Sequence, residues 1–125
     1  MNVILILLLF IVAGCEKPNT KEQNIVKGSM EHEGLVLFKQ FGCNACHSMD
    51  RDNSRGPQIN NIFNKILYLD NGDSILYDED YIVESILEPN KIILRGYKPI
   101  MPKYKNLLSK EDALKIVKYL IHMSP

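Results

Sequence analysis

The sequence lacks the features of a large, repetitive or membrane-spanning protein. It has no internal repeat and no low-complexity tract, and 125 residues leave room for one small domain. Its only long apolar run, MNVILILLLFIVAGC, is shorter than the roughly 20 apolar residues that cross a bilayer. Its formal net charge is zero. We expect a monomeric domain that has no nucleic-acid partner.

The apolar run at the start of the chain predicts export. It is too short for a stable membrane anchor and fits a cleaved signal peptide over residues 1–14. Its end, Val12-Ala13-Gly14-Cys15, resembles the lipobox of bacterial lipoproteins, in which the cysteine receives the lipid. The alternative is an ordinary signal peptide with an incidental cysteine. We expect a protein lipid-anchored through Cys15, periplasmic or on the outer face of a bacterial cytoplasmic membrane.

The cysteine count agrees with a lipid on Cys15. The chain has three cysteines, so lipidation of one leaves Cys43 and Cys46 as an even pair in an oxidising compartment. Residues 15–30 are polar, lack periodicity and contain proline and glycine. We interpret them as a flexible linker and residues 31–125 as the folded domain.

Four segments carry signals for short helices. Apolar residues recur at helical spacing from about Glu31 to Phe41, and again from Ile59 to Ile66. Asp78 can cap a third helix that Pro89 ends, and SKED at residues 109–112 is a capping box for the fourth. Asn71-Gly72 indicates a hairpin-like turn in an exposed excursion. We therefore expect an all-α fold of four short helices joined by long loops.

The stretch CNACH, residues 43–47, is the clearest chemical signal. Three chemistries use two cysteines at this spacing: a redox dithiol, half of a zinc site, and the covalent attachment of a c-type haem. A thioredoxin-like dithiol belongs to a fold with βαβ units, which this chain does not indicate. A zinc site needs four ligands, and beyond the motif only His32 and His122 remain.

Haem attachment accounts for the motif and also explains how so small a domain could have a filled centre. In a Cys-x-x-Cys-His motif the two thiols bond to the haem vinyl groups and the adjacent histidine, here His47, binds the iron. A domain of under about a hundred residues buries little surface, and a covalently held haem would fill its centre. We expect one haem c, attached through Cys43 and Cys46.

The sixth iron ligand is expected to be Met101. Met49 is too close to His47 to reach the opposite side of a haem, Met30 lies in the linker, and Met123 suits the core of the last helix. Met101 stands far downstream in GYKPIMPKY, in a loop that Pro99 and Pro102 stiffen. The expected iron is therefore ligated by His47 and Met101.

The succession of motifs resembles class I cytochromes c, and within them the C-terminal cytochrome c domain of subunit II of bacterial haem-copper oxidases. The resemblance covers residues 31–123 and is carried by CNACHS, Gly56-Pro57, DEDYIVESILEPN, GYKPIMPKY and LLSKEDALKIVKYL. It implies that the carbonyl of Pro57 accepts the Nδ1 proton of His47. It also implies that Gly34 and Phe38 of the first helix meet Tyr119 and Leu120 of the last.

The resemblance implies an electron carrier and not an oxidase, because the membrane helices and the copper-binding module of that subunit are missing from this sequence. We expect single-electron transfer in a respiratory chain. A quinol-oxidising complex or a dehydrogenase would be the donor, and a haem-copper oxidase the acceptor. Two alternatives stay open: a haem domain that reacts with a gas or peroxide, and a fixed electron-transfer subunit of a larger oxidoreductase complex.

Charge is divided unevenly along the chain. Residues 1–90 carry seven basic and thirteen acidic side chains, whereas residues 91–125 carry eight basic and two acidic ones. Lys98, Lys103 and Lys105 flank Met101. These lysines are expected to border the haem and to steer the carrier onto an acidic partner, unless they are simply solvated.

Overall fold

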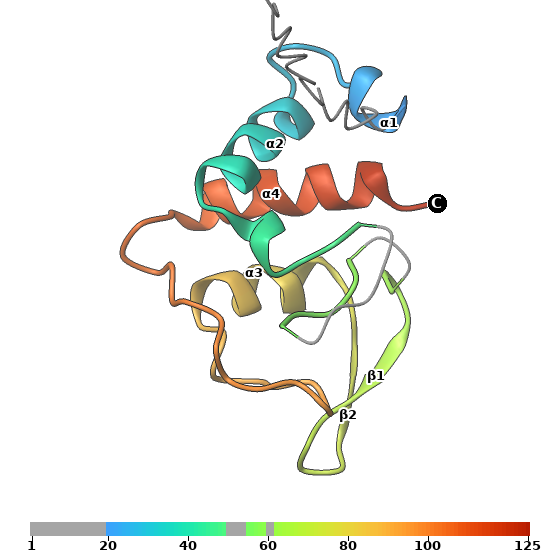
Figure 1. Cartoon of the computed structure of the whole chain (residues 1–125), viewed down its shortest axis with the longest axis vertical. Helices are drawn as coiled ribbons and strands as arrows, with labels where there is room; N and C mark the ends of the chain where they lie inside the picture. Colours follow the sequence, from blue (N-terminus) through green and yellow to red (C-terminus); the bar gives the residue numbers. More distant parts are fainter. Residues whose placement is uncertain (1–19, 50–54, 60–61) are drawn as a thin grey trace, which may run out of the picture.

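The computed structural model describes residues 20–49, 55–59 and 62–125. In chain order, its elements are α1 (Thr20–Gln23), α2 (Met30–Gln40), the 3₁₀ turn η1 (Cys43–Ala45), β1 (Ile66–Tyr68), β2 (Ser74–Leu76), α3 (Glu79–Leu87) and α4 (Lys110–Met123). In Figure 1, α2 lies across α4, α3 lies below them, and the hairpin of β1 and β2 projects at the lower end. Long irregular segments connect these elements.

The crossing of α2 and α4 forms the centre of the core. Gly34 is buried in α2, and a Cβ atom added to it would come within 1.9 Å of the backbone oxygen of Lys115. Phe38 packs against Tyr119, with ring centroids 5.4 Å apart. The contacts expected of Gly34 and Phe38 with Tyr119 are therefore confirmed. Gly34 has no side chain, and this allows the two helices to approach so closely.

The ends of the helices follow local capping chemistry. Ser29 caps α2, and its hydroxyl accepts a hydrogen bond from the amide of His32. Asp78 caps α3 by accepting from the amide of Tyr81. Ser109 and Asp112 form both halves of the capping box that starts α4. The predicted starts of α3 at Asp78 and of α4 at Ser109 are confirmed. At both positions a side-chain oxygen accepts a hydrogen bond from an amide that has no partner within the helix.

The expected all-α fold class is wrong. β1 and β2 pair antiparallel in the register Ile66–Leu76, Leu67–Ile75 and Tyr68–Ser74, and Leu69 bridges to Leu94. The predicted Asn71-Gly72 turn connects the strands, with Gly72 at φ 93°. Because Leu67 and Ile75 pack against the core, the hairpin is part of the fold. Over the described residues the protein is a small mixed α/β fold of four short helices and a two-stranded sheet.

The helix expected over residues 59–66 is also corrected. Residues 62–65 are irregular, Ile66 begins β1, and Asn60 and Asn61 lie outside the described residues. The amide of Asn64 donates to the carbonyl of Tyr77, and the amide of Tyr77 donates to the carbonyl of Lys65. Pairing with the chain after β2 therefore replaces the hydrogen bonds of a helix, and Asn64 adopts φ 60°, which a helix does not allow.

Part of the predicted linker packs against the folded domain. Glu22 in α1 accepts a hydrogen bond of 2.8 Å from the hydroxyl of Tyr119 and pairs with Lys39 at 3.1 Å. The Lys21 ammonium donates to the carbonyl of Met123, and Nε2 of His122 lies 3.2 Å from the carbonyl of Lys21. Residues 20–23 thus lie at the C-terminal end of α4.

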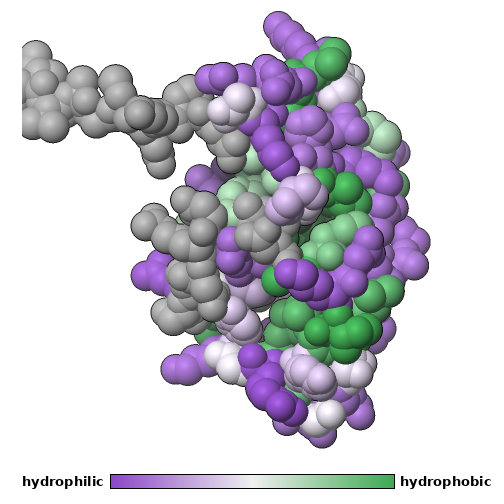
Figure 2. All heavy atoms as spheres, turned by 90° about the vertical axis from the view of Figure 1, so that its right-hand side faces the viewer, coloured by the Kyte–Doolittle hydropathy of each residue, from purple (hydrophilic) through white to green (hydrophobic). Residues whose placement is uncertain are grey.

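The hairpin exposes several large apolar side chains. Ile66, Tyr68 and Leu76 are 40% to 60% exposed, and the guanidinium of Arg95 lies 5.5 Å from the ring centroid of Tyr68. The side that carries the hairpin faces the viewer in Figure 2, where hydrophobic residues gather in the lower half among hydrophilic ones. In the part of the chain that the structure describes, no helix is long and apolar enough to cross a membrane.

Candidate functional site

A tight turn at the end of α2 presents the CNACH residues together. Gly42 adopts the left-handed conformation, with φ 68°, and lets the chain leave the helix. The amides of Cys46 and His47 both donate to the carbonyl of Cys43, at 3.2 and 2.9 Å. Cys43, Cys46 and His47 therefore project from one short turn.

His47 is held as a neutral imidazole with a defined tautomer. Its Nδ1 lies 3.1 Å from the carbonyl oxygen of Pro57, which can only accept a hydrogen bond, so Nδ1 carries the proton. Burial lowers the pKa of His47, and the hydrogen bond to Pro57 opposes this only in part. A neutral ring with its proton on Nδ1 offers the lone pair of Nε2, which is the form that binds a metal. The Pro57 contact implied by the resemblance is present, and its role at a haem stays a prediction.

Gly56 fixes the other side of the His47 ring. A Cβ atom on this residue would lie 2.7 Å from Cε1 of His47 and 3.0 Å from the carbonyl oxygen of Cys46. The first distance is shorter than real Cβ atoms show and the second is tighter than most Cβ contacts, so a glycine lets the chain pass this close to the imidazole without displacing it. Gly56 and Pro57 together determine where the ring lies.

An apolar cavity of about 350 Å³ lies beside the motif. Its walls come from the CNACH turn, the Gly56-Pro57 segment, α3, α4 and the loop before α4. The lining residues include Phe38, Cys43, Cys46, His47, Gly56, Pro57, Tyr77, Tyr81, Ile82, Ile86, Tyr97, Met101, Tyr104, Ile116 and Leu120. The structure thus brings all of the predicted site residues of the folded domain to one cavity. Cys15, the predicted lipid site, lies outside the described residues.

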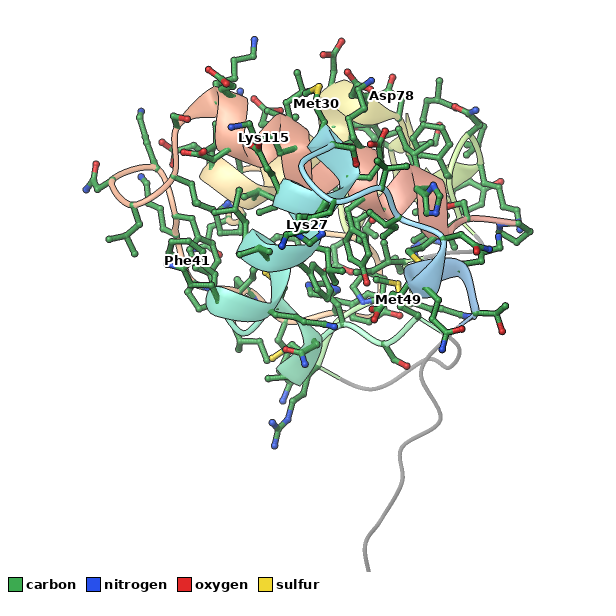
Figure 3. The ribbon with its side chains drawn as sticks, turned by 90° about the horizontal axis from the view of Figure 1, so that it is seen from above. Lys27, Met30, Phe41, Met49, Asp78 and Lys115 are labelled. Carbon is green, nitrogen blue, oxygen red and sulfur yellow. The ribbon has the colours of Figure 1, made fainter. Side chains whose placement is uncertain are left out.

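Met101 reaches this cavity from a loop, whereas the other methionines that the structure describes, Met30, Met49 and Met123, do not line it. The side chain of Met101 is half-buried, and its loop joins the region of Leu94 to α4. Met123 is buried in the core of α4, and Met30 begins α2. Figure 3 places Met49 toward α1 and away from Phe41, the C-cap residue of α2. Met101 is therefore the described methionine that shares a cavity with His47, and its role as an iron ligand stays a prediction.

The electrostatics of Cys43 do not favour a reactive redox dithiol. Burial raises the pKa of the Cys43 thiol above its ordinary value, and the neighbouring Cys46 adds to this. A reactive dithiol instead needs a lowered pKa, because the thiolate is the nucleophile. Cys43 is therefore in an environment that suppresses the thiolate.

The histidines that a zinc site would need lie far from the motif. His32 is in the first turn of α2, and CNACH follows the opposite end of that helix, roughly 15 Å away at 1.5 Å per residue. His122 is in the last turn of α4, where its Nε2 contacts the carbonyl of Lys21. Within the described ranges, no group of three or more His, Cys, Asp or Glu side chains is arranged to hold a metal ion.

The charges of the C-terminal segment are largely paired with the acidic N-terminal segment. Lys103 and Lys105 both pair with Glu88, at 2.6 and 3.0 Å. Other pairs of the same kind join Lys91 to Glu84, Lys115 to Glu33 and Lys118 to Glu79. These pairs offset the segregation of charge along the sequence. Docking through Lys103 and Lys105 would first have to compete with Glu88.

Two residues of the site carry roles that the sequence did not reveal. Gly56 allows the close approach to His47, and the hydroxyl of Tyr104 lies 3.3 Å from the carbonyl of Phe41. The signal for Gly56 was its place before Pro57, since a glycine there can mark a close approach of the backbone. Nothing in the spacing of Tyr104 pointed to Phe41, which is 63 residues away.

Comparison with protein-family models and with curated proteins finds no match to this chain. The similarity to class I cytochromes c therefore rests on the motifs described above. The function has to be argued from the cavity and its residues.

Proposed function

We propose that the protein is a membrane-tethered monohaem c-type cytochrome that carries single electrons in a respiratory chain. The observation that supports this proposal is the meeting of Cys43, Cys46, His47, Pro57 and Met101 at one apolar cavity. Cys43, Cys46 and His47 come from one turn, and Met101 comes from a loop more than fifty residues later. Two thiols, a neutral imidazole and a thioether from distant parts of the chain thus line one cavity, which is the set of groups that a c-type haem requires.

The residues of the cavity fit a covalently bound haem. A volume of about 350 Å³ lies within the range of roughly 300–1,000 Å³ that ligand pockets occupy. Its walls are mainly apolar, as a macrocycle requires, and Gly56 leaves the His47 ring uncrowded. Cys43 and Cys46 would hold the haem covalently, and His47 and Met101 would ligate its iron.

The protein side chains would tune and protect the redox centre. When bound, haem c would supply a one-electron Fe(III)/Fe(II) couple, whose potential a methionine ligand raises. The Pro57 carbonyl keeps the proton of His47 on Nδ1 and increases the basicity of Nε2. Phe38, Ile82, Ile86 and Leu120 line the cavity and would cover the faces of a bound haem with apolar side chains.

The proposal includes a location and redox partners. Removal of residues 1–14 and lipidation of Cys15 would tether the domain, residues 31–125, to the outer face of a bacterial membrane. The donor would be a quinol-oxidising complex or a dehydrogenase, and the acceptor a haem-copper oxidase. In this role the chain transfers electrons and does not itself catalyse a reaction.

The replacement Met101→Ala tests the function. The variant should keep its haem but lose the weak red absorbance band of ferric haem that reports an iron–sulfur bond, because the thioether is the only part removed. It should also bind imidazole or carbon monoxide, and its reduction potential should fall. Met49→Ala and Met123→Ala are matched controls, which should keep the band, since neither side chain lines the cavity.

Two results would contradict the proposal. If Met101→Ala keeps an unchanged spectrum, Met101 is not the ligand. If the unmodified protein already lacks the band and binds carbon monoxide readily, the open-site alternative, a gas- or peroxide-reactive haem domain, replaces the carrier.

The replacement Gly56→Ala should disturb His47 without removing any ligand. The added Cβ would overlap Cε1 of His47, so the ring has to move and its hydrogen bond to Pro57 weakens. We expect a partly high-spin absorption spectrum and a loss of stability of about 1–3 kcal/mol, the usual cost of overpacking. Gly72→Ala, in the open hairpin turn, is the control for a glycine-to-alanine change whose added Cβ meets no neighbouring atom. A low-spin spectrum unchanged in Gly56→Ala would show that this contact does not position the ring.

A further inference from the structure

The loop that carries Met101 has little internal hydrogen bonding. Pro99 and Pro102 flank Met101 closely and cannot donate backbone hydrogen bonds. The loop's own backbone bonds are local, from the amide of Ile100 to Lys98 and from the amides of Leu107 and Leu108 to Tyr104. Contacts with other elements must therefore determine where the sulfur of Met101 lies.

Tyr104 connects this loop to the segment that carries the cysteines. Its hydroxyl donates to the carbonyl of Phe41 at 3.3 Å, and its ring meets the Phe41 ring edge-on, with centroids 5.8 Å apart. Phe41 is the C-cap residue of α2 and lies two residues before Cys43. Figure 3 shows Phe41 beside the loop that leads into α4. Tyr104 thus connects the loop that carries Met101 to the end of α2, which leads into the CNACH turn.

Glu88 connects the same loop to α3. Its two carboxylate oxygens pair separately with Lys103 and Lys105, the neighbours of Tyr104 on either side. Glu88 is the C-cap residue of α3, so the loop is held at a fixed helix end. These pairs are partly exposed and weaken with salt, and we expect them to contribute less than the packed ring of Tyr104.

We propose that Tyr104 is a positioning residue for Met101 and that Glu88 assists it. The ring and hydroxyl of Tyr104 hold the Met101 loop against the end of α2, and the Glu88 pairs hold it against α3. Loss of these contacts lets the loop move away, which lowers the fraction of molecules in which the Met101 sulfur binds iron. This inference rests on the proposed function.

The test uses the holoprotein and measures ferric imidazole affinity together with the iron–sulfur absorbance band. Tyr104→Phe removes one hydrogen bond and should raise the imidazole affinity about fivefold, the factor for a typical net hydrogen bond. Tyr104→Ala also removes the ring and should raise it roughly tenfold or more. Glu88→Gln should raise it about twofold at low salt, and high salt should abolish the difference from the parent.

Tyr68→Phe and Tyr68→Ala are the matched controls, because Tyr68 is exposed on the hairpin and does not line the cavity. Their imidazole affinity should equal that of the parent. A purely structural role for Tyr104 would lower the melting temperature and leave the affinity unchanged, and this result would overturn the proposal. If Tyr104→Ala does not assemble, Tyr104→Phe decides.

The outcomes also separate this inference from the proposed function. A parent protein without covalent haem contradicts the function itself. A parent with haem, in which Met101→Ala opens the sixth position but the Tyr104 variants do not, contradicts only the role of Tyr104.

Discussion

Replacement of both Cys43 and Cys46 by alanine should leave a chain with no covalently attached haem. Among the described residues that line the cavity, the two thiols are the only groups that can form thioether bonds, and each single replacement should leave at most one such bond. The cavity of about 350 Å³ would then lose its covalent filler, and its apolar walls on α3 and α4 would contact water. We therefore expect lower stability and poor assembly as well as the loss of haem.

Haem-stained denaturing gels and thermal melting measure both effects. Asn44→Ala is the matched control, because Asn44 lies between the cysteines and is exposed. It should keep haem content and melting temperature close to those of the parent. Normal haem content in the double-cysteine variant would show that Cys43 and Cys46 do not attach a haem.

The helices with strong local signals could be predicted from the sequence. Asp78 and Ser109 place side-chain oxygens where the first amides of α3 and α4 need acceptors, and this chemistry needs no distant partner. The stretch from Ile59 to Ile66 has the same apolar spacing as a helix, but its end pairs with the chain after β2. Ile66 is 57% exposed, although a helix would have buried it. Hydrophobic spacing alone did not identify that pairing.

The hairpin shows why the fold class was wrong. Its turn was evident from Asn71-Gly72, but each strand has only three residues, too few to show the alternation that marks a strand. The strands form because Leu67 and Ile75 reach the core from the same face. Such a contact depends on the tertiary structure.

The candidate site was predictable where one short motif defines it. Cys43, Cys46 and His47 are adjacent in sequence, and Met101 was singled out by comparison with the other methionines. Gly56 was signalled only by its place before Pro57, and its closeness to His47 depends on the tertiary structure. Tyr104 contacts Phe41, 63 residues away, so no spacing revealed its role. The charge argument failed to anticipate pairing, because Glu88 precedes Lys103 by fifteen residues and yet contacts it.

The crossing of α2 and α4 should be the most sensitive point of the fold to a single added carbon. In Gly34→Ala, the Cβ would lie 1.9 Å from the backbone oxygen of Lys115 and 3.0 Å from Cβ of Tyr119. The nearest atom belongs to a helix backbone, which cannot rotate away, so the two helices must separate. Separation would loosen the packing of Phe38 against Tyr119.

The expected cost in the free energy of unfolding is about 3 kcal/mol, at the upper end for overpacking. This exceeds the roughly 1 kcal/mol that alanine gains over glycine in a helix, so the net effect remains destabilising. Urea denaturation measures it, with Val36→Ala as the control. Val36 is in the same helix but 48% exposed, and its replacement should change the stability by less than about 0.5 kcal/mol. A Gly34→Ala variant as stable as the parent would mean that α2 and α4 do not cross at this distance.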